Sequence, residues 1–248
     1  MSQMPYKTVV VTGATSGIGY ATVKLLRHLG FTVFAIGRNT QALAALVAEC
    51  GAHSIEADVR DTQYICDKLS GVEVDILVNN AGILSTNARF DKIDPAEIDQ
   101  MIDVNLKAPM QLTRSLLPGM VERKRGHLIY LGSSGGQAAY PSMGAYGPSK
   151  AGLSLFCDNL RCDLLGTSVR VSEIVPGRVQ TELYKTALGI EEAQKALYNG
   201  YRPLQPDHIA LIISQVIALP TFVDVARVEV FPTDQATGGG SMVQFEAH

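Results

Sequence analysis

The sequence predicts an α/β fold in which helices cover both faces of a doubly wound, mostly parallel sheet of seven strands. Short apolar runs rich in β-branched residues alternate with helical patterns along almost the whole chain, and this alternation is typical of a parallel sheet. The chain has 248 residues, no internal repeat and no shift in composition that would mark a linker. We therefore expect one domain over residues 1–248.

Seven segments have the composition of strands. In chain order they are 8–11, 31–36, 54–57, 74–78, 127–131, 169–175 and 225–231. The third is the weakest, because it is short and partly polar. The others are richer in apolar and β-branched residues, as expected of strands in a buried parallel sheet.

Helical patterns lie between these strands. They run from a glycine-rich turn to about residue 29, over 41–49, from 61 to about 69, from 94 to about 124, over 150–165 and over 207–219. Thr40, Asp61 and Asp94 are candidate N-caps, and Pro109 is expected to break or bend the fourth helix. The segment 181–206 interrupts the alternation, which favours an irregular substrate lid.

Composition excludes several classes of partner. The net charge is −3, so there is no basic surface to attract nucleic acid or an anionic membrane. Neither a signal peptide nor a bilayer-spanning apolar run is visible. The cysteines (Cys50, Cys66, Cys157 and Cys162) form no Cys-x-x-Cys pair and have no histidine at metal spacing. We expect a cytoplasmic protein with reduced thiols, no metal and a small-molecule partner.

A glycine-rich turn follows the first strand. Its pattern is Gly13-x-x-x-Gly17-x-Gly19, with a strand before it and a helix after it. Glycines let the backbone approach a pyrophosphate closely, and a helix N-terminus offers N–H donors to its oxygens. The turn therefore predicts a dinucleotide site.

The end of the second strand indicates which dinucleotide binds. An acidic residue at this place would hold a ribose 2′-hydroxyl, but the sequence has Gly37-Arg38-Asn39 instead. An arginine can pair with a 2′-phosphate through two hydrogen bonds. We therefore expect NADP(H) as the cofactor rather than NAD(H).

Several spaced motifs together resemble the classical short-chain dehydrogenases/reductases, which have a Rossmann fold. The motifs are Thr12-Gly13-x-x-x-Gly17-Ile18-Gly19, Asp58-Val59, Asn79-Asn80-Ala81-Gly82, the set Asn105, Ser133, Tyr146 and Lys150, and Pro176-Gly177-Arg178-Val179-Gln180-Thr181. The resemblance implies cofactor contacts from Gly13, Thr15, Ser16, Gly17, Ile18, Gly19, Arg38, Asp58, Val59, Asn80, Ala81, Gly82, Tyr146, Lys150, Pro176, Gly177, Val179 and Thr181. In particular it implies that the Asp58 side chain contacts the adenine ring.

The resemblance also implies a catalytic tetrad of Asn105, Ser133, Tyr146 and Lys150. Tyr146 would exchange a proton with the substrate, and Lys150 would lower the pKa of that phenol. Ser133 would hydrogen-bond the substrate oxygen, and Asn105 would hold a water near Lys150. Ser133 is chosen over Ser134 because family members place the serine thirteen residues before the tyrosine.

The spacing of Tyr146 and Lys150 is weak evidence alone, since Tyr64 and Lys68 share it. Residues four apart lie on one face of a helix. Pro148, however, disfavours helical backbone in the residue before it. We therefore expect the helix to begin near Pro148, with Tyr146 at its edge.

Some stretches are similar to NADP-dependent 3-hydroxy acid dehydrogenases that oxidise serine or allo-threonine. These stretches are 117–123, 159–167 and 230–235, and they lie mainly outside the expected substrate pocket. An acid substrate needs a nearby cation, for which Arg178, Lys185 and Arg202 are candidates, and Tyr140, Leu183 and Tyr184 are candidates for an apolar pocket wall.

We therefore expect an NADP(H)-dependent oxidoreductase that interconverts a secondary alcohol and a ketone by hydride transfer, with a 3-hydroxy acid as one candidate substrate. A biosynthetic ketone or β-keto-acyl reductase of the same family is an alternative. A non-catalytic NADP-binding sensor would be expected to lack part of the tetrad. The resemblance also implies a homo-oligomer, a tetramer or a dimer, formed through the helices around 109–124 and 150–165.

Overall fold

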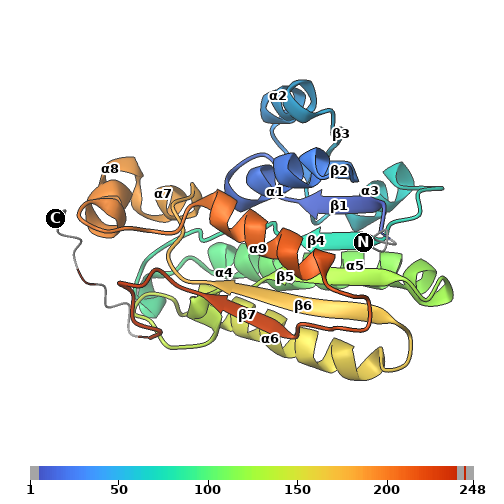
Figure 1. The fold of residues 1–248 in the computed structure, drawn as a ribbon. Coiled ribbons are helices and arrows are strands. Elements are labelled where there is room, and N and C mark those ends of the chain that lie inside the picture. The colour runs from blue at the N-terminus through green and yellow to red at the C-terminus, as the bar shows by residue number, and fades with distance from the viewer. Residues whose placement is uncertain (1–5, 239–242, 244–248) are drawn as a thin grey trace.

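A computed structural model describes residues 6–238 and 243 and contains a seven-stranded sheet (Figure 1). The strands are β1 (Thr8–Thr12), β2 (Thr32–Gly37), β3 (His53–Glu56), β4 (Ile76–Asn79), β5 (Gly126–Leu131), β6 (Val169–Pro176) and β7 (Arg227–Val230). Their order is β3-β2-β1-β4-β5-β6-β7, and every neighbouring pair is parallel. The predicted doubly wound Rossmann fold is confirmed, because the strand order reverses direction next to β1.

Helices cover both faces of this sheet. They are α1 (Gly17–His28), α2 (Thr40–Cys50), α3 (Thr62–Lys68), α4 (Pro95–Ile102), α5 (Ala108–Glu122), α6 (Tyr146–Asp163), α7 (Leu183–Leu188), α8 (Ile190–Ala193) and α9 (Pro206–Ala218). Helices α1, α2 and α9 pack on one face, while α3, α5 and α6 pack on the other. None of the helices in the described part of the chain combines the length and the apolar character needed to cross a membrane.

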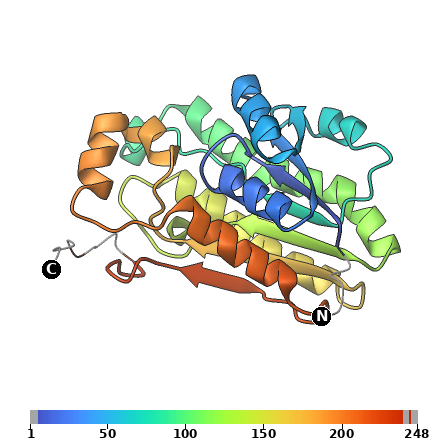
Figure 2. The same cartoon turned by 45° about the horizontal axis from the view of Figure 1, so that its top comes forward.

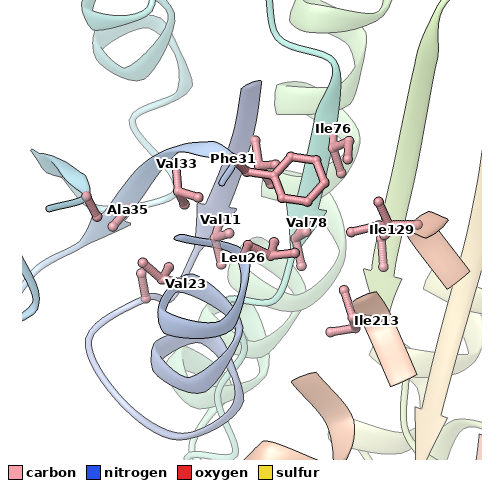
Figure 3. Close-up of a cluster of buried hydrophobic side chains, with 14 of the residues drawn as sticks. Val11, Val23, Leu26, Phe31, Val33, Ala35, Ile76, Val78, Ile129 and Ile213 are labelled. Carbon is pink, nitrogen blue, oxygen red and sulfur yellow. The ribbon is translucent and has the colours of Figure 1, made fainter. Parts of the chain in front are cut away.

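The larger core lies between the sheet and helices α1, α2 and α9. Figure 3 shows Val11 and Val78 on adjacent strands, with Leu26 of α1 and Ile213 of α9 packed over them. Leu26 and Ile213 are fully buried. Burial of such side chains contributes roughly 1.5–3 kcal/mol each. This packing fixes α1 against the end of β1, where the glycine-rich turn begins.

Two local predictions differ from the structure. Asn39, and not Thr40, caps α2, since its Oδ1 accepts a hydrogen bond from Ala42 N at 2.9 Å. The break expected near Pro109 lies earlier, in a π-helical turn at Asp103–Lys107 between α4 and α5. Asp61 and Asp94 cap α3 and α4 as predicted.

Helix α6 begins at Tyr146, not near Pro148. Backbone hydrogen bonds from Gly147 N to Met143 O and from Ser149 N to Ala145 O extend the helical pattern across the proline. Pro148 lies in the first turn of α6, where a helix tolerates a proline. Gly147 has no Cβ to collide with the proline ring. Tyr146 and Lys150 are therefore one helical turn apart on the same helix.

The segment 181–206 is more regular than predicted. It contains α7, α8 and a π-helical turn at Gln194–Tyr198. Figures 1 and 2 show α7 and α8 beyond the carboxyl ends of the strands. In a sheet of this class, ligands bind at that edge.

Candidate active site

The glycine-rich turn forms a close-packed cradle between β1 and α1. Gly13 has φ +64°, and a Cβ there would lie 2.8 Å from Ala81 Cα. A Cβ on Gly19 would collide with the carbonyl oxygen of Gly13. Ser16 precedes α1 without capping it through its side chain, which leaves the first N–H groups of the helix available to an anion.

Asn80 and Thr12 join the end of β4 to this turn. The Asn80 side chain donates to the carbonyls of Thr12 at 2.9 Å and Gly13 at 3.1 Å. The Thr12 hydroxyl accepts from the backbone N–H groups of Asn80 and Ala81, both at 3.0 Å. The two segments that resemble cofactor-binding motifs are therefore locked together in the folded chain.

Two arginines surround one carboxylate at the ends of β2 and β3. Arg60 donates to both oxygens of Asp58 at 2.9 Å, and Arg38 Nη1 lies 3.7 Å from Asp58 Oδ2. The Arg60 hydrogen bonds lower the pKa of Asp58 to about 2. The cluster carries a net positive charge, which is suited to a phosphate.

Arg60 is a candidate site residue that the sequence motifs do not include. It directly follows the Asp58-Val59 pair, and a search for basic residues beside that pair would have found it. The end of β2 itself carries no carboxylate, as the sequence shows, but the fold brings Asp58 next to Arg38. Since Arg60 engages Asp58, the carboxylate does not cancel the charge of Arg38.

A cavity of about 360 Å³ extends from Arg38 and Arg60 to Tyr146 and Lys150. The predicted cofactor residues that line it are Gly13, Thr15, Ser16, Gly17, Ile18, Arg38, Asp58, Val59, Asn80, Ala81, Gly82, Tyr146, Lys150, Pro176, Gly177, Val179 and Thr181. Gly19 does not line it and acts instead through the close approach to Gly13. The glycine-rich turn leaves room for a pyrophosphate, and the positive charge of Arg38 and Arg60 can hold a further phosphate. The cavity therefore fits a phosphorylated dinucleotide.

Ser133 and Tyr146 meet at the other end of this cavity. A Cβ on Gly135 would lie 3.4 Å from Tyr146 Cε1 and 3.5 Å from Ser133 Oγ, so both groups flank the same small space. Burial raises the pKa of Tyr146, while the neighbouring Ser133 hydroxyl lowers it. Ser134 instead begins a short helical turn and lines a second, smaller cavity.

The Lys150 ammonium is buried below this pair. Its Nζ donates to the carbonyl of Leu131 at 2.7 Å and lies 3.4 Å from the place where a Cβ would stand on Gly82. Burial lowers the pKa of Lys150 to about 8, against a smaller opposite effect of Glu173. The expectation that Lys150 brings the pKa of Tyr146 below its usual value does not hold here, because burial of the phenol outweighs other influences.

Asn105 lies inside the π-helical turn and supports the segment beside Lys150. Its Oδ1 accepts from Ile83 N at 2.8 Å, and its Nδ2 donates to Ile83 O at 2.9 Å and to Ser149 Oγ at 3.1 Å. The extra residue in a π-helical turn changes the direction of the side chains within it, a feature common at functional sites.

A second cavity of about 140 Å³ adjoins the catalytic end, with Gly177 and Tyr184 lining both. Tyr140 and Arg178 also line the smaller cavity, and the Tyr140 hydroxyl is buried without a hydrogen-bond partner among residues 6–238 and 243. Leu183 lines only the larger cavity. No cluster of potential metal ligands occurs among the residues described by the structure.

Comparison with known proteins assigns the chain to a family. Residues 7–189 match the family described as short chain dehydrogenase. A sulfoacetaldehyde reductase of Chromohalobacter salexigens is 39% identical over 92% of this chain and 95% of its own length. An NADP-dependent 3-hydroxy acid dehydrogenase of Salmonella typhi is 37% identical over 94% of this chain and 98% of its own length.

A solved structure supports the same assignment. It is the closed form of a serine dehydrogenase complexed with NADP⁺, with a TM-score of 0.89 and 34% sequence identity over 97% of this chain and 99% of that chain. At that coverage the match extends through both halves of the sheet. The chain therefore belongs to the short chain dehydrogenase family.

Proposed function

We propose that this protein is an NADP(H)-dependent oxidoreductase that interconverts a secondary alcohol and a ketone by hydride transfer. The proposal rests on one cavity that is lined by Ser133, Tyr146 and Lys150 at one end and by Arg38 and Arg60 at the other. A proton-exchanging group at one end and a phosphate site at the other are what a nicotinamide-dependent reaction requires. The family membership of the chain supports the same chemistry.

The cofactor would be held by the cradle around Gly13 and Gly19, with the 2′-phosphate between Arg38 and Arg60. When bound, NADP(H) supplies the hydride acceptor or donor for the substrate carbon. The relative from Salmonella typhi is named as NADP-dependent and the similar serine dehydrogenase holds NADP⁺, which supports this preference.

Tyr146 would exchange the proton of the substrate oxygen. Burial raises the pKa of Tyr146, so the phenol is protonated at neutral pH and is ready to donate in the direction of reduction. In oxidation the phenol must ionise, and the charged Lys150 one helical turn away favours that form. Ser133 would donate a hydrogen bond to the substrate oxygen as negative charge develops there. Asn105 would fix the backbone that packs against Lys150.

The small cavity would hold an acid group of the substrate, with Arg178 as its partner. Lys185 pairs with Glu182 at 2.6 Å, and Arg202 pairs with Asp234 at 3.0 Å. Within residues 6–238 and 243, Arg178 forms no such ion pair, and its guanidinium makes one long hydrogen bond of 3.4 Å to Leu197 O. A volume of about 140 Å³ suits a short acid, in keeping with the 3-hydroxy acid named for the Salmonella typhi relative.

The segment 181–206 would act as the lid of this substrate site. Thr181 and Tyr184 line the main cavity, and α7 and α8 stand beyond the strand ends (Figure 2). A lid that closes on bound ligands excludes water from the reacting atoms.

We also infer that the protein is cytoplasmic and forms a homo-oligomer. The oligomer would use α5 and α6, because Met110 and Leu155 expose apolar side chains on those helices.

Replacement of Tyr146 tests the assigned chemistry. Tyr146→Phe should lower kcat at least about 100-fold and leave the Kd for NADPH nearly unchanged, because general acid–base catalysis is lost while the cradle is intact. Tyr64→Phe, in the other Tyr-x-x-x-Lys pair, is the matched control and should keep full activity. Near-normal turnover of Tyr146→Phe on a panel of hydroxy acids, ketones and acyl thioesters would contradict the proposal.

A further inference from the structure

A carboxylate that the proposed chemistry does not use lies under the catalytic helix. Glu173, on β6, is 1% exposed. Its Oε2 accepts hydrogen bonds from Ser154 Oγ at 2.9 Å and from Arg227 Nε at 2.7 Å. Its Oε1 is also buried and accepts no hydrogen bond from the residues that the structure describes. A buried carboxylate with one oxygen unpartnered is costly, and such a group calls for an explanation.

The unpartnered oxygen lies against the backbone that leads to Ser133. A Cβ on Gly132 would collide with Glu173 Oε1, so the carboxylate touches this glycine. The carbonyl of the preceding residue, Leu131, accepts the hydrogen bond of Lys150 Nζ at 2.7 Å. Glu173 and Lys150 therefore contact two consecutive residues at the end of β5.

Ser154 connects the carboxylate to the same helix. It follows Lys150 by one turn and lies on the same face of α6. The Ser154 hydroxyl also accepts from Gln137 Nε2 at 2.9 Å and from Arg227 Nη2 at 2.6 Å. The network thus joins α6, β6, β7 and the turn that follows Ser133.

Other titratable groups face this site from the surrounding elements. They are Lys150, Cys157, Asp158 and Arg161 on α6, Tyr130 on β5, and Arg227 and Glu229 on β7. Asp158 lies two helical turns from Lys150 and pairs with Arg227 at 3.4 Å and with Arg161, so two cations already balance its charge. The Tyr130 hydroxyl is engaged by Thr113. Among these groups, the Glu173 carboxylate does most to favour the charged form of Lys150 and so to raise its pKa.

We propose that Glu173 is a positioning residue of the active site, whose buried carboxylate holds Lys150 in its charged form and fixes α6 against the Ser133 turn. Arg227 Nε donates to one oxygen of the carboxylate, while the other oxygen lies against Gly132. Without this anion, burial alone would drive the lysine toward its neutral form. The neutral lysine would then no longer favour the ionised phenol of Tyr146.

The effect on turnover rests on the function proposed above for Tyr146 and Lys150, so the primary test does not use activity. The titration of Lys150 can be followed in the cofactor-free protein by the NMR signal of its ¹³C-labelled Cε, assigned with Lys150→Met. The pKa of about 8 in the native protein should fall by at least about 0.5 in Glu173→Gln, because a nearby opposite charge is lost. The glutamine keeps the size of the side chain and an acceptor for Ser154.

Asp158→Asn is the matched control. It removes the other carboxylate that pairs with Arg227, and it should leave the Lys150 pKa within about 0.2 of its native value because Asp158 lies two helical turns away and is not among the charges that shift the Lys150 pKa. An unchanged Lys150 titration in Glu173→Gln, or an equal change in Asp158→Asn, would overturn the proposal. If Glu173→Gln does not fold, Arg227→Gln provides the second variant, and it should raise the Lys150 pKa because the anion is no longer neutralised.

The pH profile of alcohol oxidation then tests the consequence for catalysis. In Glu173→Gln, kcat/KM should fall about 1.5- to 3-fold at pH 7.5 and about 3- to 10-fold near pH 9, because a Lys150 pKa lower by about 0.5 to 1 leaves less of the charged lysine at each pH. The loss should vanish as the pH is lowered toward about 6, where Lys150 is charged in both proteins. A lowered Lys150 pKa with an unchanged oxidation profile would uphold the electrostatic effect of Glu173 on Lys150 and count against the role proposed for Lys150 in turnover.

Discussion

The side-chain amide of Asn105 forms a pair of hydrogen bonds with the backbone of one residue, Ile83. Its Oδ1 accepts from Ile83 N at 2.8 Å and its Nδ2 donates to Ile83 O at 2.9 Å. A Cβ on the preceding residue, Gly82, would lie 3.4 Å from Lys150 Nζ. The Asn105 amide thus fixes the strand extension that packs against the buried lysine.

Asn105→Ala should reduce both stability and turnover. The Ile83 backbone groups would lose their partners, and unsatisfied buried groups cost about 1–3 kcal/mol each. We expect a loss of about 2 kcal/mol in the free energy of unfolding, measured by urea denaturation, and roughly a 10- to 100-fold lower kcat, since small misplacements at a reacting centre have effects of that size.

Asn105→Asp separates geometry from hydrogen-bond chemistry. The carboxylate can still accept from Ile83 N, but its second oxygen would face Ile83 O without a proton between them. It should therefore resemble Asn105→Ala at pH 7. The exposed Asn159 on α6 provides Asn159→Ala as a control with native activity. Full activity of Asn105→Asp would contradict the role given to the Nδ2 donor.

The sequence allowed the two ends of the cavity to be predicted, but not the contacts between distant segments. The glycine turn and the Ser133–Tyr146–Lys150 spacing are local patterns, and local patterns can be read directly. The approach of Asp58 to Arg38 depends on β2 and β3 being neighbours. The sequence alone cannot show how side chains on two strands meet around a ligand.

Arg38 and Arg60 should contribute differently to the preference for NADPH. Arg38→Ala removes one cation, and we expect the ratio of NADH to NADPH dissociation constants to fall about 10- to 100-fold, as for loss of a charge-assisted hydrogen bond. Arg60→Ala should cost more, because Asp58 then becomes an uncompensated anion beside the phosphate. Fluorescence titration with both nucleotides measures the two ratios.

A double variant tests this explanation. Asp58→Asn in the Arg60→Ala background removes the exposed anion and should restore part of the lost NADPH affinity. Arg89→Ala, which removes an exposed arginine that pairs with Asp91, should leave both constants unchanged. Equal losses in Arg38→Ala and Arg60→Ala, with no recovery in the double variant, would argue against the charge balance described here.

Lys150 should lower the stability of the folded protein at neutral pH. Its pKa is lowered to about 8 in the folded chain from 10.5, the ordinary value expected in the unfolded chain. Between these values the unfolded chain binds more protons, so the free energy of unfolding rises with pH. Below pH 8 both states are protonated and the folded state bears the full cost of the buried charge, about 3 kcal/mol from the difference between the two pKa values.

Lys150→Met should therefore stabilise the protein by about 2–3 kcal/mol at pH 7 while abolishing activity, and this gain should disappear as the pH approaches 10.5. Urea denaturation at pH 7 and pH 10 measures both values. Lys68→Met is the control, since Lys68 is exposed and lies over the ring of Tyr64 at 5.2 Å. A gain at pH 7 that persists unchanged at pH 10 would show that packing, and not charge burial, is responsible.

The pairs Tyr64–Lys68 and Tyr146–Lys150 show that the spacing of two residues does not predict their burial. The spacing is identical, yet Tyr64 is 41% exposed and Tyr146 is 6% exposed. Tyr146 packs in a cluster with Leu84, Met101 and Leu183, and Lys150 Nζ donates to Leu131 O on β5. No four-residue pattern contains these distant contacts. The rule that Pro148 excludes Tyr146 from the helix fails here, because the lack of a Cβ on Gly147 permits the first turn to form.

Arg170 holds the end of α9 by donating to several backbone carbonyls. Its guanidinium reaches the carbonyls of Val216, Ile217 and Val223 at 3.1–3.3 Å, and its Nε donates to the Tyr6 hydroxyl at 3.2 Å. The side chain is 2% exposed. The last carbonyls of a helix have no partners within the helix and attract a cation.

Arg170→Met should therefore destabilise the protein by about 3 kcal/mol, since it leaves several buried carbonyls unsatisfied. Hydrogen exchange should be faster in the amides near 212–223 than in β1 or β4, because the loss begins at the end of α9. Arg114→Met, on the exposed face of α5, should change the stability by less than about 0.5 kcal/mol.

Arg170→Met should also weaken NADPH binding, because α9 packs against α1, which forms one side of the cofactor cradle. An unchanged exchange pattern would mean that the tail of α9 is held by its apolar packing alone.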